Sequence, residues 1–259
     1  MYDLRSLDLA LAGSMFAGKV HYAANTGSTN DDCKAAAWSG AAPGTVFVAD
    51  EQTAGRGRGD HAWHSAAGEG LYMSILLRPK IAPERLTLLP LAVGLAAASA
   101  IREATGVNVD LRWPNDLLID PHKAGGILVE SHIEAGKVAF VVAGIGINVH
   151  QREFAPGLAT PATSLDLASG ARVGRQALLL ALLHEMEEEA EGLEDAERAA
   201  EIPRRVEQVS TWVRGRGVEV HGPQACRGTT EGLDEHGFLR VRTAVGLVTV
   251  QTGGLRELI

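Results

Sequence analysis

Glycines and arginines alternate in one short segment of the sequence, AGRGRGDHAW at residues 54–63. The glycines would let backbone N–H groups approach an anion closely. Arg56 and Arg58 would add positive charge and paired hydrogen bonds to a phosphate or a carboxylate. The segment does not fit G-x-G-x-x-G, because Asp60 replaces the third glycine, and it is not a P-loop, because no G-K-[ST] follows. A flexible surface loop with solvated arginines stays open as the alternative.

A second segment, RWPNDLLIDPHKAGGILVE at residues 112–130, brings polar residues to the start of an apolar strand. Lys123 directly precedes that strand, where its ammonium group could hold a carboxylate and a phosphate together. Asp116 could bind Mg²⁺ through oxygen. Asn115 and Asp116 also follow Pro114, so ordinary turn chemistry explains these two residues equally well.

Three further positions could contact a ligand. Asn148 is polar within the otherwise apolar run AGIGINV, and a buried amide needs hydrogen-bond partners. It would either be satisfied by backbone at a bulge or bind the edge of a base or ribose. In GSTN, Ser28 or Thr29 would cap a helix or present a hydroxyl to a small polar ligand. Trp63 could stack on a flat ring.

Hydrophobic periodicity predicts the elements that must position these residues. We expect helices over residues 28–40, 84–105 and 174–200. We expect strands over residues 45–49, 71–77, 109–113, 125–133 and 137–149, the last two forming a hairpin. After about residue 213, short alternating runs separated by glycines predict a small β-barrel. The predicted domains are therefore 1–212 and 213–259.

Composition limits the class of protein. The chain has 259 residues, 46% of them hydrophobic, which is enough for a sizeable core. Its formal net charge of −8 argues against a general nucleic-acid binder. Cys33 and Cys226 form neither a zinc motif nor a disulfide framework, which is typical of the cytosol. The N-terminus is not a convincing signal peptide and no run of eighteen apolar residues occurs, so we expect a soluble cytoplasmic protein without a membrane partner.

Together, and in this order, the segments resemble the biotin–protein ligases. The resemblance rests on STN at 28–30, EQTAGRGR at 51–58 with Trp63, RWPNDLLIDPHKAGGILVE at 112–130 and GIGINV at 144–149. It covers about residues 20–150 closely, and the C-terminal part in general character. It implies an α/β (α+β) fold, in which a mixed β-sheet of the class II synthetase and biotin ligase type is packed by helices and followed by an SH3-like β-barrel.

The resemblance also implies an activity. Members of the family convert biotin and ATP to biotinyl-5′-AMP and pyrophosphate, with Mg²⁺. They then transfer biotin to one lysine of a biotin carboxyl carrier protein, usually that of acetyl-CoA carboxylase. The family includes monomers and homodimers. Fewer than thirty residues precede Ser28 and none forms a basic recognition helix, so we do not expect direct binding to DNA.

Matched position by position, the resemblance assigns the residues to three groups. The implied biotin pocket contains Ser28, Thr29, Asn30 and Gln52. The loop that would order over biotin and adenylate contains Gly55, Arg56, Gly57 and Arg58. The implied nucleotide contacts are Trp63, Asn115, Asp116, Gly125 and Asn148, with Asp116 also serving Mg²⁺. Lys123 would bridge the biotin carboxylate and the α-phosphate, and it forms the predicted catalytic set with Arg58 and Arg112.

Elementary chemistry agrees with this assignment. A carboxylate must approach the α-phosphate of ATP, and cations must hold the two anions together. The acyl-adenylate is a mixed anhydride that water would destroy, so a mobile loop that closes would protect it. Three alternatives stay open: a lipoate-activating ligase of related fold, a biotin sensor without turnover, and a glycine-rich scaffold without a ligand.

The loop departs from the family pattern, which usually reads G-R-G-R-x-G-R-x-W. Here the third glycine is Gly59, Asp60 follows it, and His61 replaces an arginine. Asp60 would repel a phosphate if it pointed inward, so we expect it to point outward. Because histidine titrates near neutral pH, His61 could also make the retention of adenylate depend on pH.

We predict that His61→Arg lengthens the time for which the protein retains biotinyl-5′-AMP, because arginine restores a permanent positive charge to the loop. The half-life of bound, radiolabelled adenylate in parent and variant measures this effect. Equal half-lives would contradict the prediction.

Overall fold

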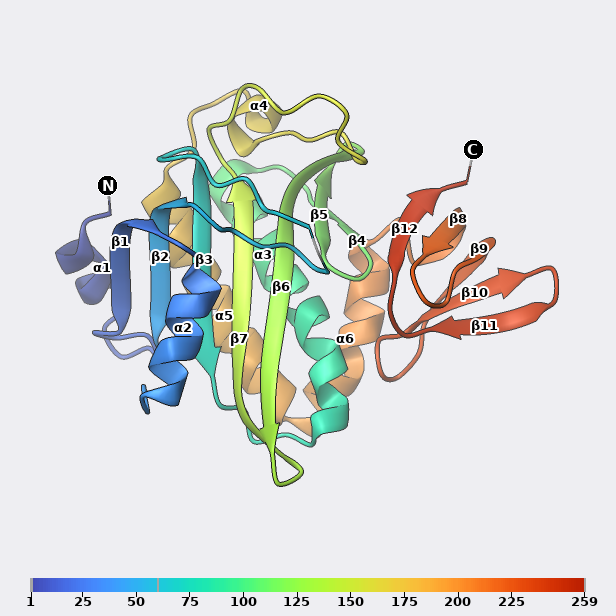
Figure 1. Cartoon of the computed structure of the whole chain (residues 1–259), viewed down its shortest axis with the longest axis horizontal. Coiled ribbons are helices and arrows are strands. Elements are labelled where there is room, and N and C mark those ends of the chain that lie inside the picture. Colours follow the sequence, from blue (N-terminus) through green and yellow to red (C-terminus); the bar gives the residue numbers. More distant parts are fainter. Residues whose placement is uncertain (1, 60, 259) are drawn as a thin grey trace.

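A seven-stranded mixed sheet forms the centre of the protein (Figure 1). The computed structural model describes residues 2–59 and 61–258. The strands are β1 Val20–Thr26, β2 Val46–Gln52, β3 Gly70–Leu77, β4 Asp110–Arg112, β5 Asp116–Ile119, β6 His122–Glu134 and β7 Lys137–Asn148. Their order across the sheet is β1-β2-β3-β7-β6-β5-β4. β1 and β2 are parallel, and the other neighbours are antiparallel.

Helices cover both faces of this sheet. The helices of the described residues are α1 Leu4–Ala10, α2 Thr29–Trp38, the 3₁₀-helix η1 Pro83–Leu88, α3 Leu89–Thr105, α4 Leu165–Ser169, α5 Arg175–Glu194 and α6 Ala196–Val209. In Figure 1, α2 lies in front of the sheet, and α3, α5 and α6 lie behind it. The helix α2 connects the parallel strands β1 and β2 and packs on β2, β3 and β7. The N-terminus of α2 therefore lies over the middle of the sheet.

Strand β3 shows why the centre of the sheet is apolar on both faces. All eight of its residues are buried, as the sequence predicts for a buried strand. Met73 and Ile75 join the large core that includes α3 and α5, whereas Leu76 packs with Cys33 of α2. Ser74 is fully buried and contacts Thr29 and Asn30 of α2. A polar side chain is thus buried directly beneath the N-terminus of α2.

Helix α3 is apolar on most of its surface, as is typical of a core helix. Within the described residues, the segment Pro83–Thr105 is long and apolar enough to cross a membrane, with a mean hydropathy of 1.4. Most of it is buried inside the protein, where it packs against α5 and β6. Gly106 ends the helix in the left-handed conformation, with φ of 72°, one residue after the predicted helix over residues 84–105 ends.

A second, smaller sheet follows α6 and lies beside the β4 edge of the central sheet (Figure 1). Its five strands are β8 Arg214–His221, β9 Cys226–Leu233, β10 Leu239–Thr243, β11 Gly246–Val250 and β12 Gly254–Glu257. All the paired strands are antiparallel, in the order β11-β10-β9-β8-β12. Trp113 donates a hydrogen bond of 3.0 Å to the Gly237 carbonyl and so links the two sheets. The SH3-like form and the boundary between residues 212 and 213 stay predictions.

The predicted helix over residues 174–200 is wrong in its extent, because the structure has two helices there. Asp195 has an extended backbone, with φ of −80° and ψ of 127°, and so interrupts the helical conformation between the two helices. Its carboxylate accepts hydrogen bonds from the N–H groups of Glu197 and Arg198. Asp195 therefore caps a new helix, α6, which continues to Val209.

The packing of α5 on α3 predicts a stability effect. Leu182 is fully buried in this core, and Leu182→Ala should lower the free energy of unfolding by about 2–5 kcal/mol through lost contacts and a cavity. Urea denaturation measures the change. The matched control is Leu9→Ala, at a side chain that is 74% exposed, which should cost less than about 0.5 kcal/mol. Equal losses in the two variants would contradict this account of the core.

Candidate active site

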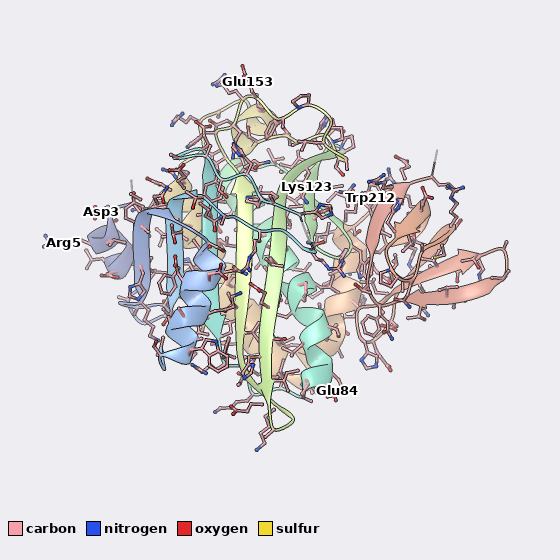
Figure 2. The ribbon with its side chains drawn as sticks, viewed as in Figure 1. Asp3, Arg5, Glu84, Lys123, Glu153 and Trp212 are labelled. Carbon is pink, nitrogen blue, oxygen red and sulfur yellow. The ribbon has the colours of Figure 1, made fainter. Side chains whose placement is uncertain are left out.

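Two of the predicted catalytic cations meet at one carboxylate. Arg112 ends β4 and Asp116 begins β5, and the two residues pair across this short hairpin. The Arg112 Nη2 atom lies 2.6 Å from Asp116 Oδ2, and Lys123 Nζ lies 2.5 Å from Asp116 Oδ1. Figure 2 shows Lys123 at the start of β6, on the side of Trp212. Three strands thus bring Arg112, Asp116 and Lys123 together.

The third predicted cation, Arg58, reaches the same region from the glycine–arginine loop. Burial lowers the pKa of its guanidinium below the ordinary value, and Asp116 is near enough to oppose that shift. The guanidinium donates hydrogen bonds to Thr252 Oγ1 and to the Gly253 carbonyl, just before β12. In this structure Arg58 therefore fastens the loop to the second sheet.

The indole of Trp63 lies against the central sheet beside Lys123. An ideal Cβ at Gly146 would lie 2.5 Å from Trp63 Nε1, and one at Gly126 would lie 3.2 Å from Trp63 Cζ3. The two glycines on β7 and β6 therefore leave the space that the indole ring fills. Lys123 Nζ lies 5.5 Å from the ring centroid, which is within cation–π distance. The indole N–H is buried and has no hydrogen-bond partner among the described residues.

The predicted biotin-binding residues meet at the N-terminus of α2. Gln52 Oε1 accepts a hydrogen bond of 2.9 Å from the Thr29 N–H, and its Nε2 donates one of 2.9 Å to Ser65 Oγ. Ser28 occupies the N-cap position, but its side chain makes no capping hydrogen bond. The prediction that Ser28 or Thr29 caps this helix with its own side chain is therefore wrong, since Gln52 of β2 accepts the helix N–H instead.

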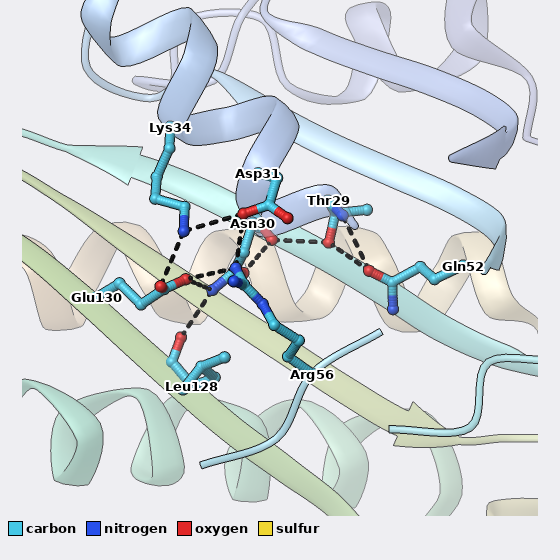
Figure 3. A network of polar contacts seen from close by, with 9 residues as sticks. Thr29, Asn30, Asp31, Lys34, Gln52, Arg56, Leu128 and Glu130 are labelled. Carbon is cyan, nitrogen blue, oxygen red and sulfur yellow. Dashed lines mark hydrogen bonds and ion pairs between the residues drawn. The ribbon is translucent and has the colours of Figure 1, made fainter. Parts of the chain in front are cut away.

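Asn30 and Arg56 both contact Glu130, a residue to which the sequence analysis assigned no role. Asn30 Nδ2 lies 2.7 Å from Glu130 Oε2, and Arg56 Nη2 lies 3.3 Å from the same oxygen (Figure 3). Partial burial raises the pKa of Glu130, but hydrogen bonds from Lys34 and Asn30 bring it below the ordinary value. The carboxylate is therefore ionised at neutral pH. The sequence feature that could have indicated a role for Glu130 is a charged residue within a partly buried strand.

The two predicted nucleotide-binding amides have backbone partners. Asn115 Nδ2 donates a hydrogen bond of 2.9 Å to the Ile127 carbonyl. Asn148 Nδ2 donates one of 3.0 Å to the Thr163 carbonyl. The backbone-satisfied alternative for Asn148 is thus observed for its nitrogen, while its oxygen accepts no hydrogen bond from the part of the chain described.

A cavity of about 520 Å³ opens beside Asn148. Its lining includes His64, Glu69, Gln151, Arg152 and Phe154. This volume lies within the range of small-molecule sites.

The segment that follows β7 forms one wall of this cavity and then returns to Lys123, whose N–H donates a hydrogen bond of 2.8 Å to the Pro161 carbonyl. Thr160 Oγ1 accepts a hydrogen bond of 2.8 Å from Arg112, a contact that the sequence did not indicate.

The predicted glycines differ in what surrounds them. A Cβ at Gly125 would lie 2.9 Å from the backbone oxygen of Gly146, so packing alone disfavours a larger residue there. Gly55 lies against the backbone of Trp63, and the Gly57 N–H donates a hydrogen bond of 2.7 Å to the His61 carbonyl. The loop is thus folded on itself here. Asp60 lies outside the described residues, so its predicted orientation stays a prediction.

The described residues contain no group of three or more His, Cys, Asp and Glu side chains that could hold a metal ion. Asp116 is the carboxylate among the cations, and it already pairs with Arg112 and Lys123. The predicted role of Asp116 as a Mg²⁺ ligand therefore requires further oxygen ligands from a substrate.

Comparison with known proteins gives consistent matches. The profile of the Biotin/lipoate A/B protein ligase family matches residues 22–148. The Bifunctional ligase/repressor BirA of Bacillus subtilis is 42% identical over 158 residues, which cover 60% of this chain and 49% of that protein. The chain thus spans about half the length of this relative. The Biotin–[acetyl-CoA-carboxylase] ligase of Mycobacterium tuberculosis is 34% identical over 241 residues, covering 91% of this chain and 87% of that protein.

A solved structure resembles the whole arrangement. The biotin protein ligase from Aquifex aeolicus, in complex with biotin and ATP, superposes with a TM-score of 0.79 at 30% identity. The match covers 93% of this chain and 100% of that chain. Both sheets therefore fall largely within the shared fold.

The contact between Gly146 and Trp63 predicts a specific cost. Gly146→Ala should lower the free energy of unfolding by about 1–3 kcal/mol, because the new methyl group would overlap the indole ring. Thermal denaturation measures it. The control is Gly254→Ala, where a Cβ would meet no atom within 4 Å and no comparable loss is expected. A Gly146→Ala protein as stable as the parent would show that the ring is not held here.

Proposed function

This chain belongs to the biotin–protein ligase family, and from that premise we propose that it activates biotin with ATP and transfers the biotinyl group to a lysine of a carrier protein. The observation that carries the proposal is the pairing of both Arg112 and Lys123 with the single carboxylate of Asp116. One carboxylate neutralises only part of these two positive charges, and Arg58 adds a third cation in the same region. The site therefore favours additional anions, as a reaction between a carboxylate and a polyphosphate requires.

In the first step, a carboxylate oxygen of biotin forms a bond to the α-phosphorus of ATP. The bond between that phosphorus and the bridging oxygen of the β-phosphate breaks, and pyrophosphate leaves with the electron pair. Lys123 and Arg58 hold the two anions side by side by exchanging their present partners for substrate oxygens. Arg112 stays fixed by Asp116 and Thr160 and keeps the local potential positive.

The nucleotide base fits the cavity beside Asn148, and biotin fits the polar cluster at the N-terminus of α2. The indole of Trp63 lies on the two glycines between these regions and forms an apolar wall for either ligand. The acyl-adenylate would then lie under the glycine–arginine loop, which excludes water from the anhydride.

Mg²⁺ fits this site as a companion of ATP. It commonly binds through one or two carboxylates together with substrate phosphates, and Asp116 offers one carboxylate. Bound there, the ion would neutralise phosphate charge. Asp116 would hold it together with oxygens of the substrate phosphates.

In the second step, the uncharged ε-amine of the carrier lysine attacks the biotinyl carbonyl carbon. The bond from that carbon to the phosphate oxygen breaks, AMP leaves, and the amine loses a proton. We propose a biotin carboxyl carrier protein of acetyl-CoA carboxylase as the partner, by analogy with the name of the Mycobacterium tuberculosis relative. A cytosolic location, a monomeric or homodimeric state, and the lack of DNA or membrane binding stay predictions.

The half-reaction gives the test. Pyrophosphate release with Mg·ATP should require biotin, and Lys123→Ala should lower its rate by roughly 100-fold or more, the usual cost of removing a group that stabilises charge in the transition state. Lys137→Ala, at the exposed first residue of β7, is the matched control and should leave the rate unchanged.

Repeating the measurement of pyrophosphate release with lipoate in place of biotin tests which of the two acids the protein activates. Release that depends on lipoate and not on biotin would overturn the assignment of substrate. Tight binding of biotin without any release would favour a sensor without turnover.

A further inference from the structure

Four charged side chains close a ring of ion pairs between α2, β6 and the glycine–arginine loop (Figure 3). Lys34 Nζ lies 2.9 Å from both Asp31 Oδ1 and Glu130 Oε1. Arg56 Nη2 lies 2.6 Å from Asp31 Oδ1 and 3.3 Å from Glu130 Oε2. Arg56 is the member of the ring that belongs to the glycine–arginine loop, so its ion pairs hold the loop against α2 and β6.

The two carboxylates are not equivalent. The side chain of Asp31 is 53% exposed, so water screens its ion pairs strongly. The side chain of Glu130 is 30% exposed and is carried by β6, a central strand. Glu130 also accepts a hydrogen bond of 2.7 Å from the Asn30 side chain. Glu130 therefore belongs to the ion-pair ring and also contacts Asn30 of the proposed biotin pocket.

An ionised carboxylate can only accept hydrogen bonds, and this restriction sets the direction of the neighbouring bonds. The Asn30 amide must turn its NH₂ group toward Glu130, which leaves its carbonyl oxygen 2.6 Å from Ser74 Oγ. Ser74 Oγ also lies 2.7 Å from Thr29 Oγ1. Because a hydroxyl carries one proton, giving it to Asn30 makes Ser74 an acceptor toward Thr29.

The chain of contacts continues to the base of the loop. The Thr29 N–H donates a hydrogen bond to Gln52 Oε1, and Gln52 Nε2 donates one to Ser65 Oγ, beyond the end of the loop. Biotin presents a neutral ureido group with two N–H donors and one carbonyl acceptor. Such a group binds well only where donors and acceptors are fixed in advance, because a donor facing a donor leaves both unsatisfied.

We propose that Glu130 is a positioning residue for biotin: its carboxylate orients the Asn30–Ser74–Thr29 hydrogen bonds and holds Arg56 beside them. The inference rests on the proposed function and goes beyond it, because Glu130 contacts the pocket residues and the loop rather than the reacting atoms. Neutralising Glu130 would let the Asn30 amide rotate and would release one carboxylate from Arg56.

The test compares three carboxylate-to-amide variants of the same protein: Glu130→Gln, Asp31→Asn and Glu134→Gln. Glu134 is exposed at the end of the same strand and serves as the matched control. Biotin affinity is measured by calorimetric titration, and KM for biotin, KM for ATP and kcat are measured by pyrophosphate release.

Glu130→Gln should weaken biotin binding and raise its KM by roughly tenfold or more, the effect of losing a hydrogen bond to a charged group. KM for ATP and kcat should stay close to the parent's values. Asp31→Asn, although it removes the shorter ion pair to Arg56, should have a much smaller effect on biotin. Glu134→Gln should match the parent.

A biotin affinity unchanged by Glu130→Gln would overturn the proposal, as would an equal rise in both KM values or an equal effect of Asp31→Asn. If Glu130→Gln does not fold, Ser74→Ala interrupts the same hydrogen bonds without changing a charge and should weaken biotin binding alone. A parent protein that binds biotin without releasing pyrophosphate would refute the ligase function, while the titrations would still decide the role of Glu130.

Discussion

Two cations, Arg112 and Lys123, share the carboxylate of Asp116, and much of the fold serves to hold them there. Arg112 and Asp116 face each other across the β4–β5 hairpin, and Lys123 joins them from the first residues of β6. The Arg112 guanidinium also lies over the ring of Trp212, 5.2 Å from its centroid, which is within cation–π distance. Gathering like charges is unfavourable without an anion, so the protein supplies Asp116 as a resting partner. Substrate anions can replace that partner at little additional electrostatic cost.

The glycine–arginine loop spans the site because its two arginines rest on different supports. Arg56 is held by Asp31 and Glu130 near α2, whereas Arg58 is held by Thr252 and the Gly253 carbonyl before β12. The loop thus connects the proposed biotin pocket to the second sheet. Each contact involves an arginine that could instead bind a ligand anion. The glycines between them permit the backbone to change when those partners change.

Local signals predicted the main elements well, because burial and periodicity are properties of short segments. The two-sided burial of β3, the β6–β7 hairpin and the stop at Gly106 could all be predicted this way. Contacts between distant segments could not: Arg58 and Thr252 are 194 positions apart, and Asn30 and Glu130 are 100 apart. The Asp195 cap was overlooked because the apolar pattern continues through it. Ser74 carried a usable signal, a lone hydroxyl within an apolar strand.

The central claim is that Lys123 and Arg58 exchange protein partners for substrate anions. A crystal structure of the protein with biotinyl-5′-AMP, or with a stable analogue of it, tests this directly. The account predicts that Lys123 Nζ leaves Asp116 and contacts both the acyl oxygen and the α-phosphate, and that Arg58 leaves Thr252 for the same phosphate. A complex in which Lys123 stays paired with Asp116, while the phosphate lies elsewhere, would contradict it.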